Sequence, residues 1–221
     1  MACDFTVASD LAVFGQAGPK HGSAPDGGST DFLPLFVGIE AAMRSCTLCE
    51  YWSAYEAKQI GLISEVAPAL KINGEFVGNP TLVLDRYIDE RGNVVFGSKK
   101  SGDDFAKGKA MLKEGEIDLS ELDKEVDALV TKLALTMPGC LTRTVESVRK
   151  HKRAHWDQNR EGSRSWLGLN MMTEAKLGFR AFNEGPKGKR EVDFFELRER
   201  LAHGEKWSDE FIDSLIPKAD A

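Results

Sequence analysis

The chain has 221 residues, of which 42% are apolar and 29% charged, a balance typical of a globular protein that buries a hydrophobic core. Its formal net charge of −6 argues against nucleic-acid binding, because phosphate contacts require a basic face. No stretch reaches the ~18 consecutive apolar residues that span a bilayer, so we expect a cytoplasmic protein without a membrane segment.

Two short strands and a long loop are predicted first. Phe5 and Val7, and Ala12 and Phe14 after a turn at Ser9-Asp10, alternate with the period of a β-strand. The loop from Gly15 to Thr30 is too rich in helix breakers to form a helix, since it contains Gly15, Gly18, Pro19, Gly22, Pro25, Gly27 and Gly28. Its length is typical of a functional loop rather than of a passive connection.

The middle of the chain changes from helix to hairpin. From Phe32 onward the pattern is helical, and Ser53 and Glu56 have the spacing of a capping box that begins a short helix ending at Gly61. Leu62 to Val66 then predicts a strand. Residues 68–117 alternate around Asn73-Gly74 and Gly92-Asn93, which are turn pairs typical of β-hairpins, and so predict an inserted hairpin-rich segment.

The last part, residues 118–221, is predicted to be helical. Apolar residues recur at helical spacing from Leu119 to Leu133, which predicts a helix of about 17 residues that stops at Pro138-Gly139. Further helices follow, with breaks expected near Gly162, at Gly185-Pro186 and at Gly204, and a last one between Ser208 and Pro217.

Neither the cysteines nor the histidines predict a metal site. The four cysteines are too few and too scattered for a disulfide framework, and we expect reduced thiols. Cys46 and Cys49 form a C-x-x-C without a second pair at zinc-site spacing, so we interpret them as small buried side chains. His151 and His155 lie four residues apart, but no glutamate completes a zinc-protease motif.

The glycine-rich loop carries a family resemblance. The segment FGQAGPKHGSAPDGGSTDFL, together with MACDFTVASDLAVFGQ before it and AYEAKQIGLISEV after it, resembles the crotonase (enoyl-CoA hydratase/isomerase) superfamily. Cys3-Asp4, Gly22, Pro25, Gly27-Gly28 and Ala57 to Leu62 hold the places of the family motifs. The resemblance implies an α/β fold, namely the C-terminal portion of a crotonase β-β-α superhelix, with 1–67 as partial core and active-site loop, 68–117 as insert and 118–221 as a helical oligomerisation region.

Two departures at this loop bear on the reaction. Family hydratases carry a glutamate where this chain has Gly18, so one of their two acids is missing. Asp26, directly after Pro25, instead gives the P-D-x-G-G form of family isomerases, dehalogenases and acyl-CoA hydrolases. The loop, the insert and the C-terminal part together resemble family members that open a ring hydrolytically in anaerobic aromatic degradation.

The resemblance implies a cyclic enone coenzyme A thioester as the substrate and no cofactor beyond the coenzyme A that it carries. One water adds to the double bond, a second attacks the ring ketone, and the ring opens to 3-hydroxypimeloyl-CoA. The alternatives are an enoyl-CoA hydratase, an acyl-CoA thioester hydrolase, or an inactive fragment that acts only in assembly. Family members begin far upstream of Met1 and carry their oxyanion-hole donors there, so we expect this chain alone to be inactive.

Two loop residues are candidates for catalysis. Asp26 is the predicted base, since burial in an apolar pocket would raise its pKa; the alternative is an aspartate that stabilises its own turn. His21 is the second candidate, because its charge changes near neutral pH; the alternative is a solvent-exposed loop histidine. Gln16, Lys20 and Ser23 are predicted to bind the substrate.

Two features of the helical region have open interpretations. The basic run from Arg149 to Arg153 forms either a solvated helical face or a contact to coenzyme A phosphates or a partner subunit. Trp166, Phe179 and Phe182 are interpreted as core or subunit packing. By resemblance, the complete protein is expected to form a homo-trimer or hexamer.

Overall fold

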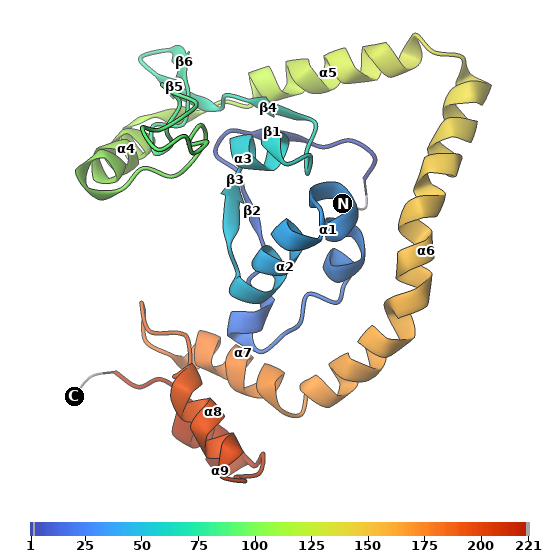
Figure 1. The fold of residues 1–221 in the computed structure, drawn as a ribbon. Helices are drawn as coiled ribbons and strands as arrows, with labels where there is room; N and C mark the ends of the chain where they lie inside the picture. Colours follow the sequence, from blue (N-terminus) through green and yellow to red (C-terminus); the bar gives the residue numbers. More distant parts are fainter. Residues whose placement is uncertain (2, 220–221) are drawn as a thin grey trace.

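Two pairs of short strands lie at the centre of the computed structural model, which describes residues 1 and 3–219 (Figure 1). β1 (Val7–Ser9) pairs in parallel with β4 (Glu65–Ala67), and β2 (Val13–Gly15) pairs in antiparallel with β3 (Tyr51–Ser53). The two predicted strands before the loop are therefore confirmed, each three residues long. β4 begins three residues later than predicted, because the amides of Ser64 and Glu65 first bind the carbonyl of Thr6.

The glycine-rich loop contains one turn of 3-10 helix, η1 (Gly18–His21), which the sequence did not predict. Pro19 favours this turn, because the first turn of a helix needs no N–H from that residue. Helices α1 (Ser29–Val37) and α2 (Ile39–Leu48) follow and pack against each other. α1 begins three residues before Phe32, directly after Gly28, whose φ of 108° ends the loop.

Helix α3 (Ala54–Gln59) begins with the predicted capping box. The Ser53 hydroxyl accepts from the amide of Glu56 at 3.1 Å, and the Glu56 carboxylate accepts from the amide of Ser53 at 2.9 Å. The same carboxylate accepts from the Ser98 hydroxyl at 2.9 Å, so that the cap also holds one point within the insert.

Ser53→Ala should lower the free energy of unfolding by about 1 kcal/mol, since it removes the capping oxygen. Ser101→Ala is the matched control, because Ser101 stands at the N-cap of α4 (Gly102–Glu114) and its side chain makes no capping hydrogen bond. Urea denaturation of both variants checks this, and equal losses would show that the capping bond contributes nothing.

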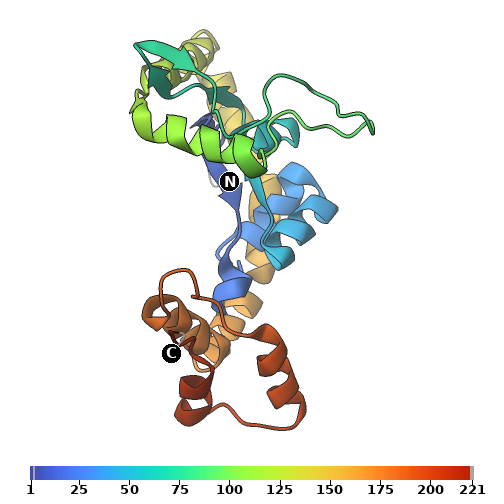
Figure 2. The same ribbon diagram turned by 90° about the vertical axis from the view of Figure 1, so that its left-hand side faces the viewer.

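The insert is built on a three-stranded sheet. β5 (Leu70–Ile72) pairs with β6 (Glu75–Val77) on one side and with β7 (Glu116–Ile117) on the other. Asn73 and Gly74 have φ values of 52° and 83°, as a two-residue hairpin turn of type I′ requires, and this predicted hairpin is confirmed. Around Gly92-Asn93 a single bridge joins Ile88 to Val94, and the segment extends as a long loop (Figure 2).

Within the predicted hairpin-rich segment, residues 102–114 form α4, a helix that the sequence did not predict. Gly108 masks this helix in the sequence, because glycine weakens a helix interior. The structure explains the glycine: a Cβ at this position would lie 2.5 Å from the carbonyl oxygen of Pro80.

A buried aspartate ties the insert to the central strands. Asp10 is fully buried, and its carboxylate accepts from the amides of Ala69 at 3.1 Å and Asn79 at 2.7 Å. The Asn79 side chain donates back to the Asp10 carbonyl at 2.9 Å. Burial raises the pKa of Asp10, and the two backbone donors oppose that rise.

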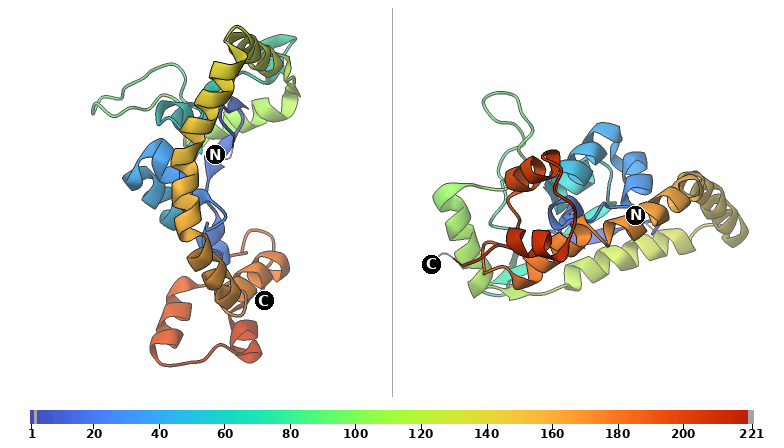
Figure 3. Two further views of the ribbon diagram at one scale, coloured as in Figure 1. Left: turned by 90° about the vertical axis from the view of Figure 1, so that its right-hand side faces the viewer. Right: turned by 90° about the horizontal axis from the view of Figure 1, so that it is seen from below.

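The C-terminal region is helical as predicted, but its breaks differ. α5 (Ser120–Ala134) is followed by the 33-residue α6 (Pro138–Asn170), which Pro138 opens at its first turn. The predicted break near Gly162 is wrong, since α6 continues through it; a Cβ there would meet nothing within 4 Å, as at an exposed helix position. Figure 3 shows α6 running from the α5 end of the molecule to its opposite end.

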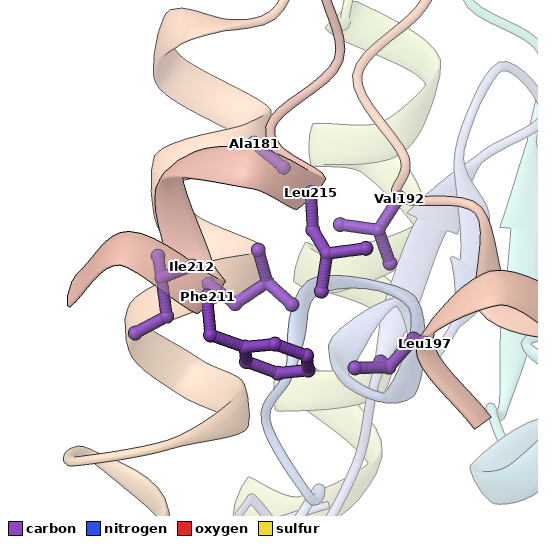
Figure 4. Close-up of a cluster of buried hydrophobic side chains, with 7 residues drawn as sticks. Ala181, Val192, Leu197, Phe211, Ile212 and Leu215 are labelled. Carbon is purple, nitrogen blue, oxygen red and sulfur yellow. The ribbon is translucent and has the colours of Figure 1, made fainter. Parts of the chain in front are cut away.

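Three further helices complete the chain: α7 (Glu174–Glu184), α8 (Phe194–Ala202) and α9 (Asp209–Leu215), which end or begin at the predicted positions near Gly185, Gly204 and Ser208. They enclose a hydrophobic cluster in which Leu177 and Ile212 are each 1% exposed (Figure 4). None of the helices in the described residues is long and apolar enough to cross a membrane.

Candidate active site

The glycine-rich loop docks on α7 through two facing glycines. A Cβ on Gly22 would lie 1.9 Å from the carbonyl oxygen of Glu174, and one on Gly178 would lie 2.2 Å from the carbonyl carbon of His21. Gly22 also has a φ of 74°, which only glycine adopts at little cost. The turn after η1 and the middle of α7 therefore touch backbone to backbone.

A cavity of about 550 Å³ opens beside this contact. The loop forms one wall and α7 and α8 form another, with three residues of α2 and one of α6 completing the lining. Most of the lining is apolar, and the contributions from outside the loop include Met43, Trp166, Leu177, Val192, Phe194 and Leu197. The size and chemistry suit a ring-sized organic group held by apolar contacts.

Asp26 lines this cavity and is partly buried. Within the described residues its carboxylate accepts no hydrogen bond, and the local bond is instead made by its backbone amide, which donates to the Ala24 carbonyl at 2.8 Å. The alternative, an aspartate that stabilises its own turn, would require a hydrogen bond to the Asp26 carboxylate, and none is formed within the described residues. Burial raises the pKa of Asp26, and the nearby Asp31 carboxylate raises it further.

Asp31 lies in the first turn of α1 and is only 4% exposed. Its Oδ1 accepts from the Asn159 side chain of α6 at 2.7 Å, while its buried Oδ2 has no partner in the described chain. Neither Asp31 nor Asn159 was predicted from the sequence as a site residue.

Lys20 and Ser23 line the same cavity as Asp26. The Lys20 ammonium lies 3.5 Å from the Glu191 carboxylate, with both side chains about half exposed, and the Ser23 hydroxyl donates to the Ala24 carbonyl at 3.3 Å. Three of the five predicted site residues are thus brought together. The α8 residue Arg198 also lines the cavity and is exposed.

Gln16 and His21 lie elsewhere. Gln16 lines a second cavity of about 230 Å³, next to Met1, Leu33 and Trp52. The His21 ring packs edge-on against Phe182 of α7 with 4.9 Å between the ring centroids, and its Nδ1 is buried without a partner among the described residues. The structure therefore places His21 at the contact between loop and helix rather than in the wall of the Asp26 cavity.

The basic run on α6 holds the start of the chain. Arg149 makes a two-pronged contact to the Asp4 carboxylate, and the Lys152 ammonium donates to the carbonyls of Cys3 at 2.8 Å and Met1 at 3.2 Å. These contacts give Arg149 and Lys152 a structural explanation that the sequence left open.

The cysteines are free, as expected, and Cys46 contributes to the cavity that Asp26 lines. Burial raises the pKa of its thiol, so the reduced form stays protonated. In the described part of the chain, no group of three or more histidine, cysteine or acidic side chains could hold a metal ion.

Comparison with known sequences matches residues 1–83 to the family described as enoyl-CoA hydratase/isomerase. The chain is 59% identical over 220 residues to a 6-oxocyclohex-1-ene-1-carbonyl-CoA hydrolase of Geobacter metallireducens and 56% identical to one of Thauera aromatica. Each alignment covers 99% of this chain and 58% of the relative, so the chain spans somewhat more than half the length of these curated relatives.

Solved structures agree on the fold. An enoyl-CoA hydratase of Mycobacterium avium subsp. paratuberculosis superposes with a TM-score of 0.54 at 20% identity, covering 83% of this chain and 55% of that one. One from Bacillus halodurans gives 0.51 at 19% identity, covering 81% of this chain and 53% of that one. The predicted α/β crotonase fold with a helical C-terminal region is confirmed.

Proposed function

We propose that the protein belongs to the enoyl-CoA hydratase/isomerase family, whose model matches residues 1–83, and that it acts on 6-oxocyclohex-1-ene-1-carbonyl-CoA and opens its ring with two molecules of water. The relatives named 6-oxocyclohex-1-ene-1-carbonyl-CoA hydrolase are 44–59% identical to this chain over nearly its whole length. Within the structure, one observation carries the proposal: an unpaired, partly buried carboxylate, Asp26, in the wall of an apolar cavity.

The proposed chemistry has two additions of water. In the first, the hydroxyl of water adds to the double-bond carbon that does not bear the thioester. The proton adds to the double-bond carbon that bears the thioester. That carbon then lies between the ring ketone and the thioester. In the second, water attacks the ketone, and the bond between these two carbons breaks. The ketone carbon becomes a carboxylate, and the bonding electrons pass to the thioester as an enolate, which is protonated to give 3-hydroxypimeloyl-CoA.

Asp26 is proposed to orient water and to take its proton. The apolar side chains of α7 and α8 would hold the ring, and their exclusion of water strengthens the electrostatic interactions of the carboxylate. Lys20, Arg198 and Ser23 line the same cavity and supply the cations and the hydroxyl that suit an anionic, carbonyl-rich thioester.

The predicted roles of His21 and Gln16 stay predictions. His21 directly precedes Gly22 and lies against Phe182, so a role in holding the loop is compatible with its position. Gln16 would meet a part of the substrate that extends beyond the Asp26 cavity.

We further propose that the enzyme needs no cofactor beyond the coenzyme A of its substrate, that it forms a homo-trimer or hexamer, and that it works in the cytoplasm. Exposed large apolar side chains on α6 and α7 are consistent with subunit packing, among them Trp166, Leu169, Phe179 and Phe182.

The pH profile should show the raised pKa of Asp26. On acidification, a carboxylate with a raised pKa becomes protonated at a higher pH than usual. The acidic limb of the kcat/KM profile should therefore lie above ~3.9, the pKa of an ordinary aspartate. Asp31→Asn removes the neighbouring charge and should move this limb to lower pH. kcat/KM measured as a function of pH for both proteins checks the shift, and a limb that stays in place would exclude Asp31 as its cause.

Product mass tests the proposed reaction. The full-length protein, incubated with the cyclic enone thioester, should give a thioester product heavier than the substrate by two waters. A gain of one water would indicate a hydratase, and free coenzyme A would indicate a thioester hydrolase.

A further inference from the structure

Two asparagines of α6 contact the segment that carries Asp26, one at each end. The Asn170 side chain donates to the carbonyl of Gly22 at 2.6 Å, and the Asn159 side chain donates to the Asp31 carboxylate at 2.7 Å. Asp26 lies between these two contacts in the sequence. No other helix donates side-chain hydrogen bonds to residues 22–31 in the described part of the chain.

The spacing of the two asparagines matches the helix. They are eleven residues apart, about three turns at 3.6 residues per turn, so both side chains leave α6 on the same face. α6 is 33 residues long and packs against α1 and α7, which makes it a rigid support for both contacts.

Burial makes both contacts costly to lose. Asn170 is 1% exposed and Asp31 4% exposed, and each also has a buried oxygen without a partner in the described residues. An Asp31 carboxylate that lost Asn159 would be left buried with no hydrogen-bond donor among residues 1 and 3–219, a state that costs far more than an ordinary hydrogen bond. The segment between the contacts contains Gly27, whose Cβ would meet nothing within 4 Å, and Gly27 itself is exposed. Around Asp26 the backbone hydrogen bonds of the segment are local, from the amide of Asp26 to Ala24 and from that of Thr30 to Pro25.

We propose that Asn159 and Asn170 are positioning residues that clamp residues 22–31 at both ends and so hold the Asp26 carboxylate against the cavity. This inference rests on the proposed function, because it assigns the two asparagines to the base of that reaction. The clamp acts through Asp26 and makes no contact with the substrate. It connects the C-terminal half of α6 to the loop wall of the cavity that contains Asp26.

Alanine at either position should lower kcat about 10- to 100-fold with KM within about two-fold, since a misplaced base loses rate without losing binding. Asn159→Gln and Asn170→Gln, which keep the amide donor, should recover part of the loss. Asn183→Ala and Gln158→Ala are the controls, because both residues are exposed and neither side chain donates a hydrogen bond to residues 22–31 in the described part of the chain. All variants are made in the full-length protein and assayed by loss of enone absorbance.

Amide hydrogen exchange separates a clamp from a general support of the fold. Asn170→Ala should speed exchange in residues 22–31 while α9 exchanges at its wild-type rate, whereas a general role would speed both. Should an alanine variant fail to fold, the serine variant, whose hydroxyl is too short to reach, takes its place with the same expected fall in kcat. Wild-type kcat in the alanine or serine variants, or a change in KM alone, overturns the clamp. Full activity of Asp26→Asn would instead overturn the role of Asp26.

Discussion

Asp26→Asn should reduce kcat for water addition by ~10²–10⁴, the usual contribution of a general base, while KM for the thioester stays within about two-fold. The amide is nearly the same size as the carboxylate and fits the same wall of the cavity, but it cannot take a proton from water. Because the Asp26 carboxylate accepts no hydrogen bond within the described chain, the substitution breaks no structural contact there. Enone absorbance followed in the full-length protein measures the effect.

Asp127→Asn is the control for that substitution. Asp127 is exposed on α5, away from the cavity, and its loss of charge should leave kcat and KM unchanged. Wild-type turnover in Asp26→Asn would remove Asp26 from the mechanism. A large rise in KM alone would make Asp26 a binding residue.

Gly178→Ala should destabilise the protein by at least ~1–3 kcal/mol and also lower its activity, because the new methyl group meets backbone rather than a movable side chain. Its Cβ would lie 2.2 Å from the carbonyl atoms of His21 and 2.7 Å from the amide nitrogen of Gly22. The loop must move away from α7 to make room, and this movement displaces the cavity wall that contains Asp26. Thermal denaturation and kcat measure the two effects.

Gly162→Ala is the matched control on α6. A Cβ there would meet nothing within 4 Å, so alanine should stabilise the helix by up to ~1 kcal/mol without changing kcat. If Gly178→Ala melted at the wild-type temperature with full activity, the backbone contact between loop and α7 would not hold the site together.

The sequence predicted those elements whose signals are local. The capping box of Ser53 and Glu56 and the turn at Asn73-Gly74 are read directly from adjacent residues, and the structure contains both. Local reasoning failed where glycine has a tertiary explanation. Gly108 hid α4 because its close approach to Pro80 is visible only in the fold, and Gly162 suggested a break where an exposed helix simply tolerates it.

The candidate site, too, was predictable only in the part that local sequence determines. The glycine-rich loop was predictable from its helix breakers, whereas Asp26 was chosen as the candidate base because the P-D-x-G-G pattern resembles that of family members. The opposite wall was not, because helical periodicity in α7 and α8 does not say which loop their faces meet. The spacing of Asn159 and Asn170 on one face of α6 was the available signal for the clamp, but it required knowing that α6 is unbroken at Gly162.

A crystal structure of the full-length protein with a saturated ring thioester, cyclohexane-1-carbonyl-CoA, tests the central claim most directly. The ring should lie between the loop and the helices α7 and α8, with an Asp26 oxygen within ~3 Å of a water that faces the ring. A ring bound beside Gln16 in the smaller cavity, with the Asp26 carboxylate out of reach, would contradict it.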